Sequence, residues 1–293
     1  MLGGQLHDPV RERRPRRKCS AAPLVLPDTS QLTFARRGRD SLHLQPPVDK
    51  HPAKILVIDL GGTQVKILAT GETDVRKAPS GRSMTALQMV EVVRELAQGW
   101  DYEAVSLGYA GQVGPEGPRV DNGNLGPGWV GFDFAAAFGA PVKVINDAAM
   151  QAIGSYAGGR MLFIGLGTGV GSALVTQRSV LPLELGELRI RRKSTLNDYL
   201  GRAGLKRLGL RKWREAVADA VSFLKPAFLA DYVMIGGGNA KELKEPPPWS
   251  RLGSNLCAFR GGYRLWGLEL TPTLTPDGRQ EESPAADREW RMV

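Results

Sequence analysis

Glycine-rich turns follow three separate apolar segments, and this repeated arrangement constrains the fold more than any other feature of the sequence. Apolar runs of this length that end in turn residues are typical of buried strands. The chain is therefore expected to contain buried strands that are each followed by a tight glycine turn. The segments and their turns are 55–58 with Asp59-Leu-Gly-Gly-Thr63, 161–166 with Gly167-Thr168-Gly169, and 232–235 with Gly236-Gly237-Gly238-Asn239.

The segments between these turns alternate between helical and strand patterns. Alternation of this kind predicts an α/β layer architecture. With 293 residues, of which 42% are hydrophobic, the chain is long enough to bury a sizeable core. In chain order, the expected elements are a helix over 84–98, strands over 105–111 and 142–145, and helices over 148–156 and 213–224.

Changes in composition indicate the domain organisation. Two lobes are expected, over 53–144 and 145–270, although one large domain also suits this length. Residues 1–52 form a basic, proline-rich leader that we expect to be disordered, and its composition is also typical of an overextended gene start. The polar, proline-containing residues 271–293 are expected to form a flexible tail.

The net charge of +9 comes in large part from the leader, where residues 11–18 are rich in arginine. A nucleic-acid-binding arm is the functional alternative, but no aromatic or helical pattern accompanies the charge. The leader also shows no pair of periodic helices joined by a short turn, which a DNA-binding helix-turn-helix would need. No DNA partner is therefore expected.

Composition also argues against membrane and disulfide-rich classes. No apolar run reaches the roughly 18 residues of a membrane span, and the basic start lacks the apolar stretch of a signal peptide. Cys19 and Cys257 lie far apart and give neither a disulfide framework nor metal-ligand spacing. We therefore expect a soluble, cytoplasmic protein with no membrane partner.

The glycine turns are candidate phosphate-binding sites. Backbone N–H groups can meet a phosphate chain at such turns, because glycine has no Cβ to hold the backbone away. In the first turn, Asp59 can hold Mg²⁺ through water, Thr63 can donate its hydroxyl, and Lys66 adds positive charge. An ordinary hairpin is the alternative for each turn, because a lone glycine cluster often marks only a bulge or tight packing. Three such turns favour the phosphate interpretation.

Asp147 is the candidate catalytic base. Asn146-Asp147 follows a predicted strand and precedes a helix of small residues, where open α/β sheets bind ligands. In phosphoryl transfer to a hydroxyl, a carboxylate at this place accepts the proton while positive groups neutralise the transferred phosphate. The alternative is that Asp147 only caps the helix.

Two further segments are candidates for binding sugar hydroxyls. The loop over 122–129 combines the amides of Asn122 and Asn124 with Trp129, which suits hydroxyls held against an apolar wall. Glu184 and Glu187 follow a strand and can accept from adjacent hydroxyls. A plain connecting turn and a pair of surface carboxylates are the respective alternatives.

Read in chain order, these motifs resemble the ROK family (repressors, open reading frames and sugar kinases), and within it the polyphosphate glucokinase-like branch. The resemblance covers about residues 55–267. The ordered set of motifs is far more specific than any one member. The motifs are Asp59-Leu-Gly-Gly-Thr63, Asn124-Leu-Gly-Pro-Gly-Trp129, Asn146-Asp147-Ala-Ala, Gly165-Leu-Gly-Thr-Gly169, Glu184-Leu-Gly-Glu187 and Ile235-Gly-Gly-Gly-Asn-Ala240.

The resemblance implies a two-lobed actin-like ATPase (ribonuclease H-like) fold with mixed sheets flanked by helices. It also implies Mg²⁺-dependent phosphorylation of glucose at the 6-hydroxyl, with ATP, polyphosphate or both as donor, and a homodimer. Asp147 would be the general base, and the sugar would contact Asn124, Asn146 and Glu184. The residues around the phosphates and nucleotide would be Asp59, Gly61, Gly62, Thr63, Gly167, Thr168, Gly169, Gly236, Gly237, Gly238 and Asn239.

The sequence departs from the family pattern in two places. Many relatives carry a cysteine-rich zinc loop after the glutamate motif, whereas this chain has the basic run 189–193, so no zinc is expected. That run either lines a channel for a polyanion or is a solvated charged face. The second departure is Glu187, which stands where the family motif has histidine. Two adjacent carboxylates are expected to raise the pKa of one of them or to turn one away from the sugar.

Two alternatives to a glucose kinase remain at this point. Glu187 favours a kinase for another hexose or an amino sugar, because it changes a residue expected to contact the sugar. The repressor members of the family favour a non-catalytic sugar-binding regulatory protein, which would act on protein partners here.

Overall fold

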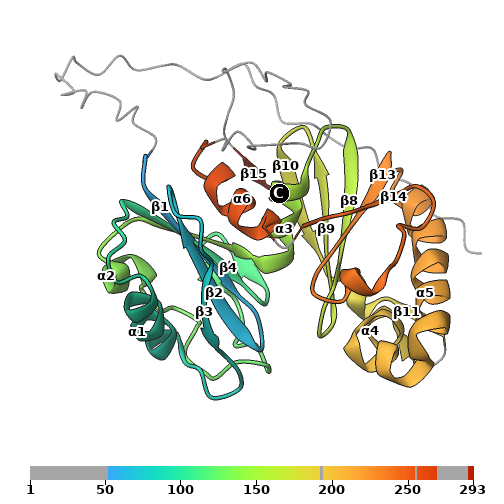
Figure 1. Ribbon diagram of the computed structural model, residues 1–293, viewed down its shortest axis with the longest axis horizontal. Coiled ribbons are helices and arrows are strands. Elements are labelled where there is room, and N and C mark those ends of the chain that lie inside the picture. Colours follow the sequence, from blue (N-terminus) through green and yellow to red (C-terminus); the bar gives the residue numbers. More distant parts are fainter. Residues whose placement is uncertain (1–51, 192–193, 255, 269–289) are drawn as a thin grey trace, which may run out of the picture. The chain divides into compact units, whose positions relative to one another are not determined.

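The computed structural model describes residues 52–191, 194–254, 256–268 and 290–293 (Figure 1). The expected leader over 1–52, apart from Pro52, and most of the expected tail over 271–293 lie outside the described residues. The described part contains two mixed sheets flanked by helices, which confirms the predicted fold class. The division into lobes at residue 145 stays a prediction.

The first large sheet has five strands in the order β3-β2-β1-β4-β7. β1 runs antiparallel to β2 and parallel to β4, and β4 runs parallel to β7. Helix α1 begins with a capping box formed by Thr85 and Gln88, which satisfies free N–H groups of its first turn. The elements of this part are β1 (Ile55–Leu60), β2 (Gln64–Ala69), β3 (Arg76–Pro79), α1 (Ala86–Leu96), β4 (Ala104–Tyr109), β5 (Val113–Gly114), β6 (Gly117–Pro118), α2 (Phe134–Phe138) and β7 (Val142–Asn146).

The second large sheet has six strands in the order β14-β13-β8-β9-β10-β15. β8 and β9 form an antiparallel hairpin, and β13 runs parallel to β8. Helix α5 lies along this sheet in Figure 1. The elements are α3 (Asp147–Ser155), β8 (Arg160–Leu166), β9 (Val170–Thr176), β10 (Ser179–Leu183), β11 (Arg189–Arg191), β12 (Ser194–Thr195), α4 (Leu196–Leu200), α5 (Arg202–Ala227), β13 (Tyr232–Gly236), β14 (Ser250–Leu252), α6 (Cys257–Arg264) and β15 (Arg291–Met292), with short 3₁₀ helices at Leu185–Glu187 and Ala240–Glu242.

Alternation along the central strands distributes their side chains between separate hydrophobic clusters. In β1, Leu56 and Ile58 pack with α1, whereas Ile55 and Val57 pack with α3 and α6. Successive strand residues point to opposite faces, so a strand that is buried on both faces is apolar throughout. The same α3–α6 cluster includes residues of β8 and β9, so both large sheets contribute to it.

The end of the chain differs from the expected flexible tail. Arg291–Met292 forms β15, which pairs in parallel with β10, and Trp290 lies edge-on to Tyr156 with ring centroids 5.6 Å apart. The pairing is long-range and leaves no local trace in a polar terminal sequence. The tail prediction is therefore wrong for residues 290–293, while 271–289 lie outside the described residues.

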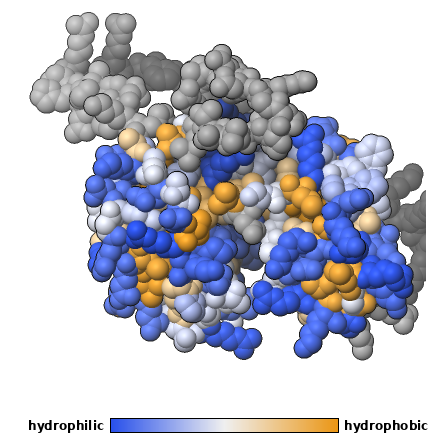
Figure 2. Space-filling view, viewed as in Figure 1, coloured by the Kyte–Doolittle hydropathy of each residue, from blue (hydrophilic) through white to orange (hydrophobic). Residues whose placement is uncertain are grey.

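Most large apolar side chains are enclosed in the clusters, and the face shown in Figure 2 is largely hydrophilic with hydrophobic areas interspersed. No helix among the described residues is long and apolar enough to cross a membrane.

Candidate functional site

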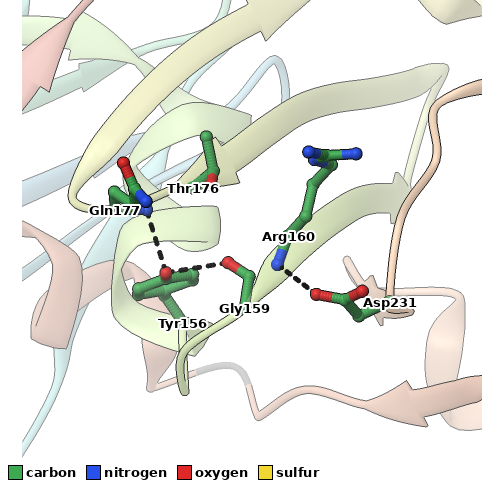
Figure 3. Close-up of a pocket in the computed structure, with 6 residues that line it drawn as sticks. All are labelled: Tyr156, Gly159, Arg160, Thr176, Gln177 and Asp231. Carbon is green, nitrogen blue, oxygen red and sulfur yellow. Dashed lines mark hydrogen bonds between the residues drawn. The ribbon is translucent and has the colours of Figure 1, made fainter.

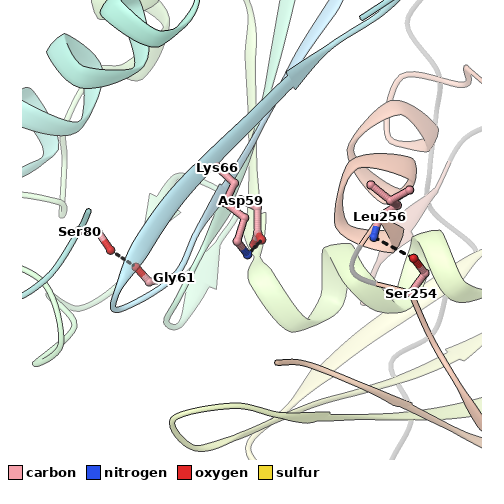
Figure 4. Close-up of polar contacts among 6 residues, drawn as sticks. All are labelled: Asp59, Gly61, Lys66, Ser80, Ser254 and Leu256. Carbon is pink, nitrogen blue, oxygen red and sulfur yellow. Dashed lines mark hydrogen bonds and ion pairs between the residues drawn. The ribbon is translucent and has the colours of Figure 1, made fainter. Parts of the chain in front are cut away.

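The first glycine turn joins β1 to β2 and places a partly buried ion pair beside it. Asp59, which is only 6% exposed, lies opposite Lys66 in the antiparallel register, and Lys66 Nζ is 3.0 Å from Asp59 Oδ2 (Figure 4). The turn itself is closed by a bond from the Gly61 N–H to the Gln64 carbonyl at 3.0 Å. Lys66 therefore forms an ion pair with Asp59 beside the turn.

The loop over 122–129 contacts this turn through Asn124. A Cβ on Gly62 would lie 2.9 Å from the Asn124 Cβ, so glycine is needed there for the loop to approach. Asn124 is exposed, and its backbone N–H donates to Asn122 Oδ1 at 2.7 Å. The structure thus brings Asn124 to the first glycine turn, although 62 residues separate it from Gly62 in the sequence.

Trp129 has a different place from the one expected. Its side chain is fully buried, its Nε1 donates to the Gly126 carbonyl at 2.7 Å, and its ring lies 5.2 Å from that of Tyr109. Backbone N–H groups of Gly128 and Trp129 donate to Asp121, which lowers the pKa of Asp121. The expectation that Trp129 gives a sugar an apolar wall is wrong, because the ring belongs to the core of the first sheet.

The second and third glycine turns lie in contact. The second turn closes with a bond from the Gly167 N–H to the Gly169 carbonyl at 3.0 Å, and Asn239 Nδ2 donates to the Gly167 carbonyl at 2.9 Å. Gly237 has φ 83°, and a Cβ there would lie 2.5 Å from the Leu166 carbonyl oxygen. The third turn therefore supports the second through backbone contact that only glycine permits.

Asp147 is the first residue of α3, and Asn146 is the N-cap. Asn146 Oδ1 accepts from the Ala149 N–H at 3.0 Å, and its Nδ2 donates to the Gly111 carbonyl at 3.0 Å. These bonds leave Asn146 one amide hydrogen and one lone pair for a sugar. Asp147 Oδ1 accepts from the adjacent Ala148 N–H at 2.8 Å. Asn146, rather than Asp147, fills the capping role considered for this dipeptide.

The electrostatics single out Asp147. Burial, together with the nearby carboxylates of Asp59 and Glu184, raises its pKa from 3.8 to about 7, against the lowering effect of the Ala148 N–H. Carboxylates from three distant segments therefore interact at one place. A strongly shifted carboxyl with specific charged neighbours is typical of a functional site.

A short 3₁₀ helix follows β10, with Glu184 as its N-cap and Glu187 as its last residue. Partial desolvation raises the pKa of Glu184, and the Glu187 carboxylate adds to the shift, although the Glu184 side chain keeps solvent exposure. Glu187 Oε1 accepts from Asn197 Nδ2 at 2.8 Å. Of the two outcomes expected for this pair, the structure shows a raised pKa on one member.

Asn197 was missed by the sequence interpretation. The available signal was Thr195-x-x-Asp198, which resembles a capping box and does form one at the start of α4. That signal predicts where the helix begins, but not that Asn197 turns its amide toward Glu187.

The donor set fits a bound Mg²⁺ that is shared with a substrate. Among residues 52–191, 194–254, 256–268 and 290–293, no group of three or more His, Cys, Asp or Glu side chains could hold a metal ion. Mg²⁺ usually takes only one or two protein carboxylates and completes its shell with waters and phosphate oxygens. Asp59, which interacts with Asp147, provides such a partial set.

Two surface cavities lie elsewhere. One, of about 370 Å³, is lined by polar groups of Tyr156, Arg160, Gln177 and Asp231 (Figure 3). Another, of about 310 Å³, lies beside α2 and β7. Neither is lined by Asp59, Asp147 or Glu184, so charge and hydrogen bonding, rather than cavity size, locate the candidate site.

No protein-family model and no curated protein sequence matches the chain. Among solved structures, the inorganic polyphosphate/ATP-glucomannokinase of Arthrobacter sp. strain KM has a TM-score of 0.59 at 22% identity, over 71% of this chain and 96% of that one. A ROK family glucokinase from Streptomyces griseus, solved with glucose and AMPPNP, has a TM-score of 0.57 at 16% identity, over 71% and 97%. A ROK family transcriptional regulator homologous to the E. coli MLC protein has a TM-score of 0.54 at 17% identity, over 71% and 76%. The chain thus has the actin-like ATPase fold that these ROK sugar kinases and regulators share.

Proposed function

We propose that the protein is a sugar kinase that phosphorylates the 6-hydroxyl of glucose, with Asp147 as the general base. The observation that carries the proposal is the environment of Asp147, a partly buried carboxyl with its pKa raised to about 7 beside Asp59 and Glu184. A general base works best when its pKa lies near the operating pH. Structures of ROK kinases with the same fold support the assignment.

Each segment of the candidate site has a role in this proposed reaction. Asp147 takes the proton of the 6-hydroxyl as that oxygen bonds to the terminal phosphorus of the donor, and the shortened donor leaves with the electrons of the broken P–O bond. Asn124, Asn146, Glu184 and Glu187 hold the sugar. The phosphates meet the first turn at Gly61, Gly62, Thr63 and Lys66, and the second turn at Gly167, Thr168 and Gly169. The third turn lies beside the nucleotide with Gly236, Gly237, Gly238 and Asn239. Mg²⁺, when bound through water at Asp59, would neutralise phosphate charge.

The rate is expected to depend on pH through Asp147. Its carboxyl must be ionised to accept a proton, so kcat/KM for the sugar should rise with pH and level off above about 7. A pH profile between 5 and 9 measures this. Because the Glu184 charge raises the pKa of Asp147, Glu184→Gln should move the acid limb to lower pH even though it also weakens sugar binding. A profile that is flat between pH 5 and 8 would contradict the assignment of the base.

Polyphosphate is a candidate donor beside ATP, because a basic helix starts at the second glycine turn. The Arg202 N–H at the start of α5 donates to the carbonyls of Gly167 and Thr168, at 3.0 and 3.2 Å. Of the basic run 189–193, Arg192 and Lys193 lie outside the described residues, but Arg189 is exposed. The exposed cations of the first part of α5 are Arg202, Lys206, Arg207, Arg211 and Lys212.

Charge removal on α5 should therefore affect the two donors differently. Lys206→Gln/Lys212→Gln is expected to weaken polyphosphate use and to reduce the slope of log(kcat/KM) against log[salt] by roughly one to two units, since each lost phosphate contact contributes about 0.7–0.9. ATP-driven rates should change less than twofold. Lys77→Gln, on β3, is the matched control. Equal loss with both donors would contradict a polyanion surface on α5.

The acceptor is tested by profiling. Glucose, mannose and N-acetylated amino sugars should be compared by kcat/KM, because Glu187 changes the expected contacts of a glucose site.

The shared fold of the transcriptional regulator supports a second candidate, a sugar-binding regulatory protein. Such a protein would bind sugar in both wild type and Asp147→Asn without turnover in either.

A further inference from the structure

Asn197 joins two segments of the candidate site with a single side chain. Its Oδ1 accepts from the Val170 N–H at 2.7 Å, directly after the second glycine turn. Its Nδ2 donates to Glu187 Oε1 at 2.8 Å. Opposite ends of one carboxamide therefore hold the glycine turn proposed to meet the phosphates and the glutamate proposed to contact the sugar.

The surrounding backbone is shaped to receive this amide. A Cβ on Gly169 would lie 2.8 Å from Asn197 Oδ1, and a Cβ on Gly186 would lie 2.4 Å from the same atom. Two glycines from different segments thus leave the room that Asn197 fills. The capping box of Thr195 and Asp198 fixes the start of α4 independently of the Asn197 side chain.

We propose that Asn197 is a positioning residue, which holds Glu187 and the turn at 167–169 in fixed relation so that both substrates bind productively. The inference rests on the proposed kinase function. After desolvation, the charge of Glu187 is the second cause that raises the pKa of Glu184, so the orientation of Glu187 also affects the electrostatics of the sugar-binding side. The direction of the hydrogen bond matters, because an ionised Glu187 has only acceptors to offer and needs a donor opposite it.

Reversing that hydrogen bond provides the test. Asn197→Asp keeps an acceptor for the Val170 N–H but sets a carboxylate against Glu187. The sugar KM at pH 8 should rise at least tenfold, with a smaller change in kcat. Adding Glu187→Gln restores the hydrogen bond with its direction reversed, because the glutamine amide can donate to the aspartate at position 197. The double variant should recover at least fivefold of the lost affinity, although Glu187→Gln alone weakens sugar binding.

The controls separate positioning from general stability. Thr195→Ala removes the cap of the same helix, so it should lower the melting temperature without changing either KM. An unchanged KM in Asn197→Asp, or no recovery in the double variant, would overturn the role of Asn197. Tryptophan fluorescence can measure sugar affinity without turnover in wild type, in both single variants and in the double variant. If the wild type shows no turnover while the sugar affinities of the variants still fall and recover as expected, that result would reject the kinase assignment and retain Asn197 as a positioning residue for sugar binding.

Discussion

Asp147→Asn should abolish turnover and stabilise the folded protein at the same time. Loss of a general base typically slows a reaction by about 10²–10⁴, and Asn cannot accept the hydroxyl proton. The stabilisation follows from the raised pKa of Asp147, which means that the native state holds a proton between roughly pH 4 and 7 that the unfolded chain has released.

The free energy of unfolding should therefore depend on pH. Since the native state binds more protons in that window, the free energy of unfolding falls as pH rises through it. A shift from 3.8 to about 7 corresponds to at most about 4 kcal/mol at pH 8, and we expect roughly 1–4 kcal/mol to be recovered in Asp147→Asn. Urea unfolding at pH 8 and pH 4 measures it, and the advantage should disappear at pH 4.

Asp121→Asn is the matched control. Backbone N–H groups of Trp129 and Gly128 lower the pKa of Asp121, so this substitution should destabilise the protein at pH 8. An Asp147→Asn protein that is less stable than wild type at pH 8, or that keeps a tenth of its turnover, would contradict the role given to Asp147.

Gly261→Ala should cause a large loss of stability. Helices α3 and α6 approach so closely that a Cβ on Gly261 would lie 1.8 Å from the Met150 carbonyl oxygen, and one on Gly154 would lie 1.8 Å from that of Cys257. These contacts are with backbone, so no rotamer change relieves them. Alanine normally favours a helix by about 1 kcal/mol over glycine, but here overpacking should cost at least about 3 kcal/mol.

Displacement of α3 and α6 in Gly261→Ala should also disturb the candidate site. Met150 and Gly154 belong to the helix that begins at Asp147, and a Cβ on Gly262 would lie 2.3 Å from Val57 Cγ1, on the strand that ends near Asp59. Displaced helices would therefore separate the two carboxylates. Urea unfolding measures the loss, with Gly253→Ala as control because its nearest neighbour lies at an ordinary 3.5 Å. A change within about 0.5 kcal/mol in Gly261→Ala would contradict this packing, since that is the usual size of surface effects.

Local patterns predicted several of the strands, turns and helices, because these depend on residues close in sequence. The run 55–58 and the turn after it form β1 and the β1–β2 turn, and the small-residue segment after Asp147 forms α3. Burial of Trp129 was not predictable in this way. Its exclusion from solvent depends on Tyr109, 20 residues earlier, and on Phe134, whereas its own neighbours are loop-forming residues.

Interactions between distant segments account for the remaining differences. The Asn197 amide reaches Val170, 27 residues away, and β15 pairs with β10 over more than a hundred residues. Such pairs depend on tertiary packing that no periodicity encodes. By contrast, the family resemblance implied that Asp147 and Asp59 belong to one site, and the charge interaction between these residues agrees with it.

The most direct test is whether the purified protein forms a sugar 6-phosphate. Wild type and Asp147→Asn should be incubated with glucose, Mg²⁺ and either ATP or polyphosphate, and the products followed by ³¹P NMR. The proposed function predicts glucose 6-phosphate from the wild type with at least one donor and none from the variant. Sugar binding without any phosphorylated product, for every hexose and both donors, would contradict it.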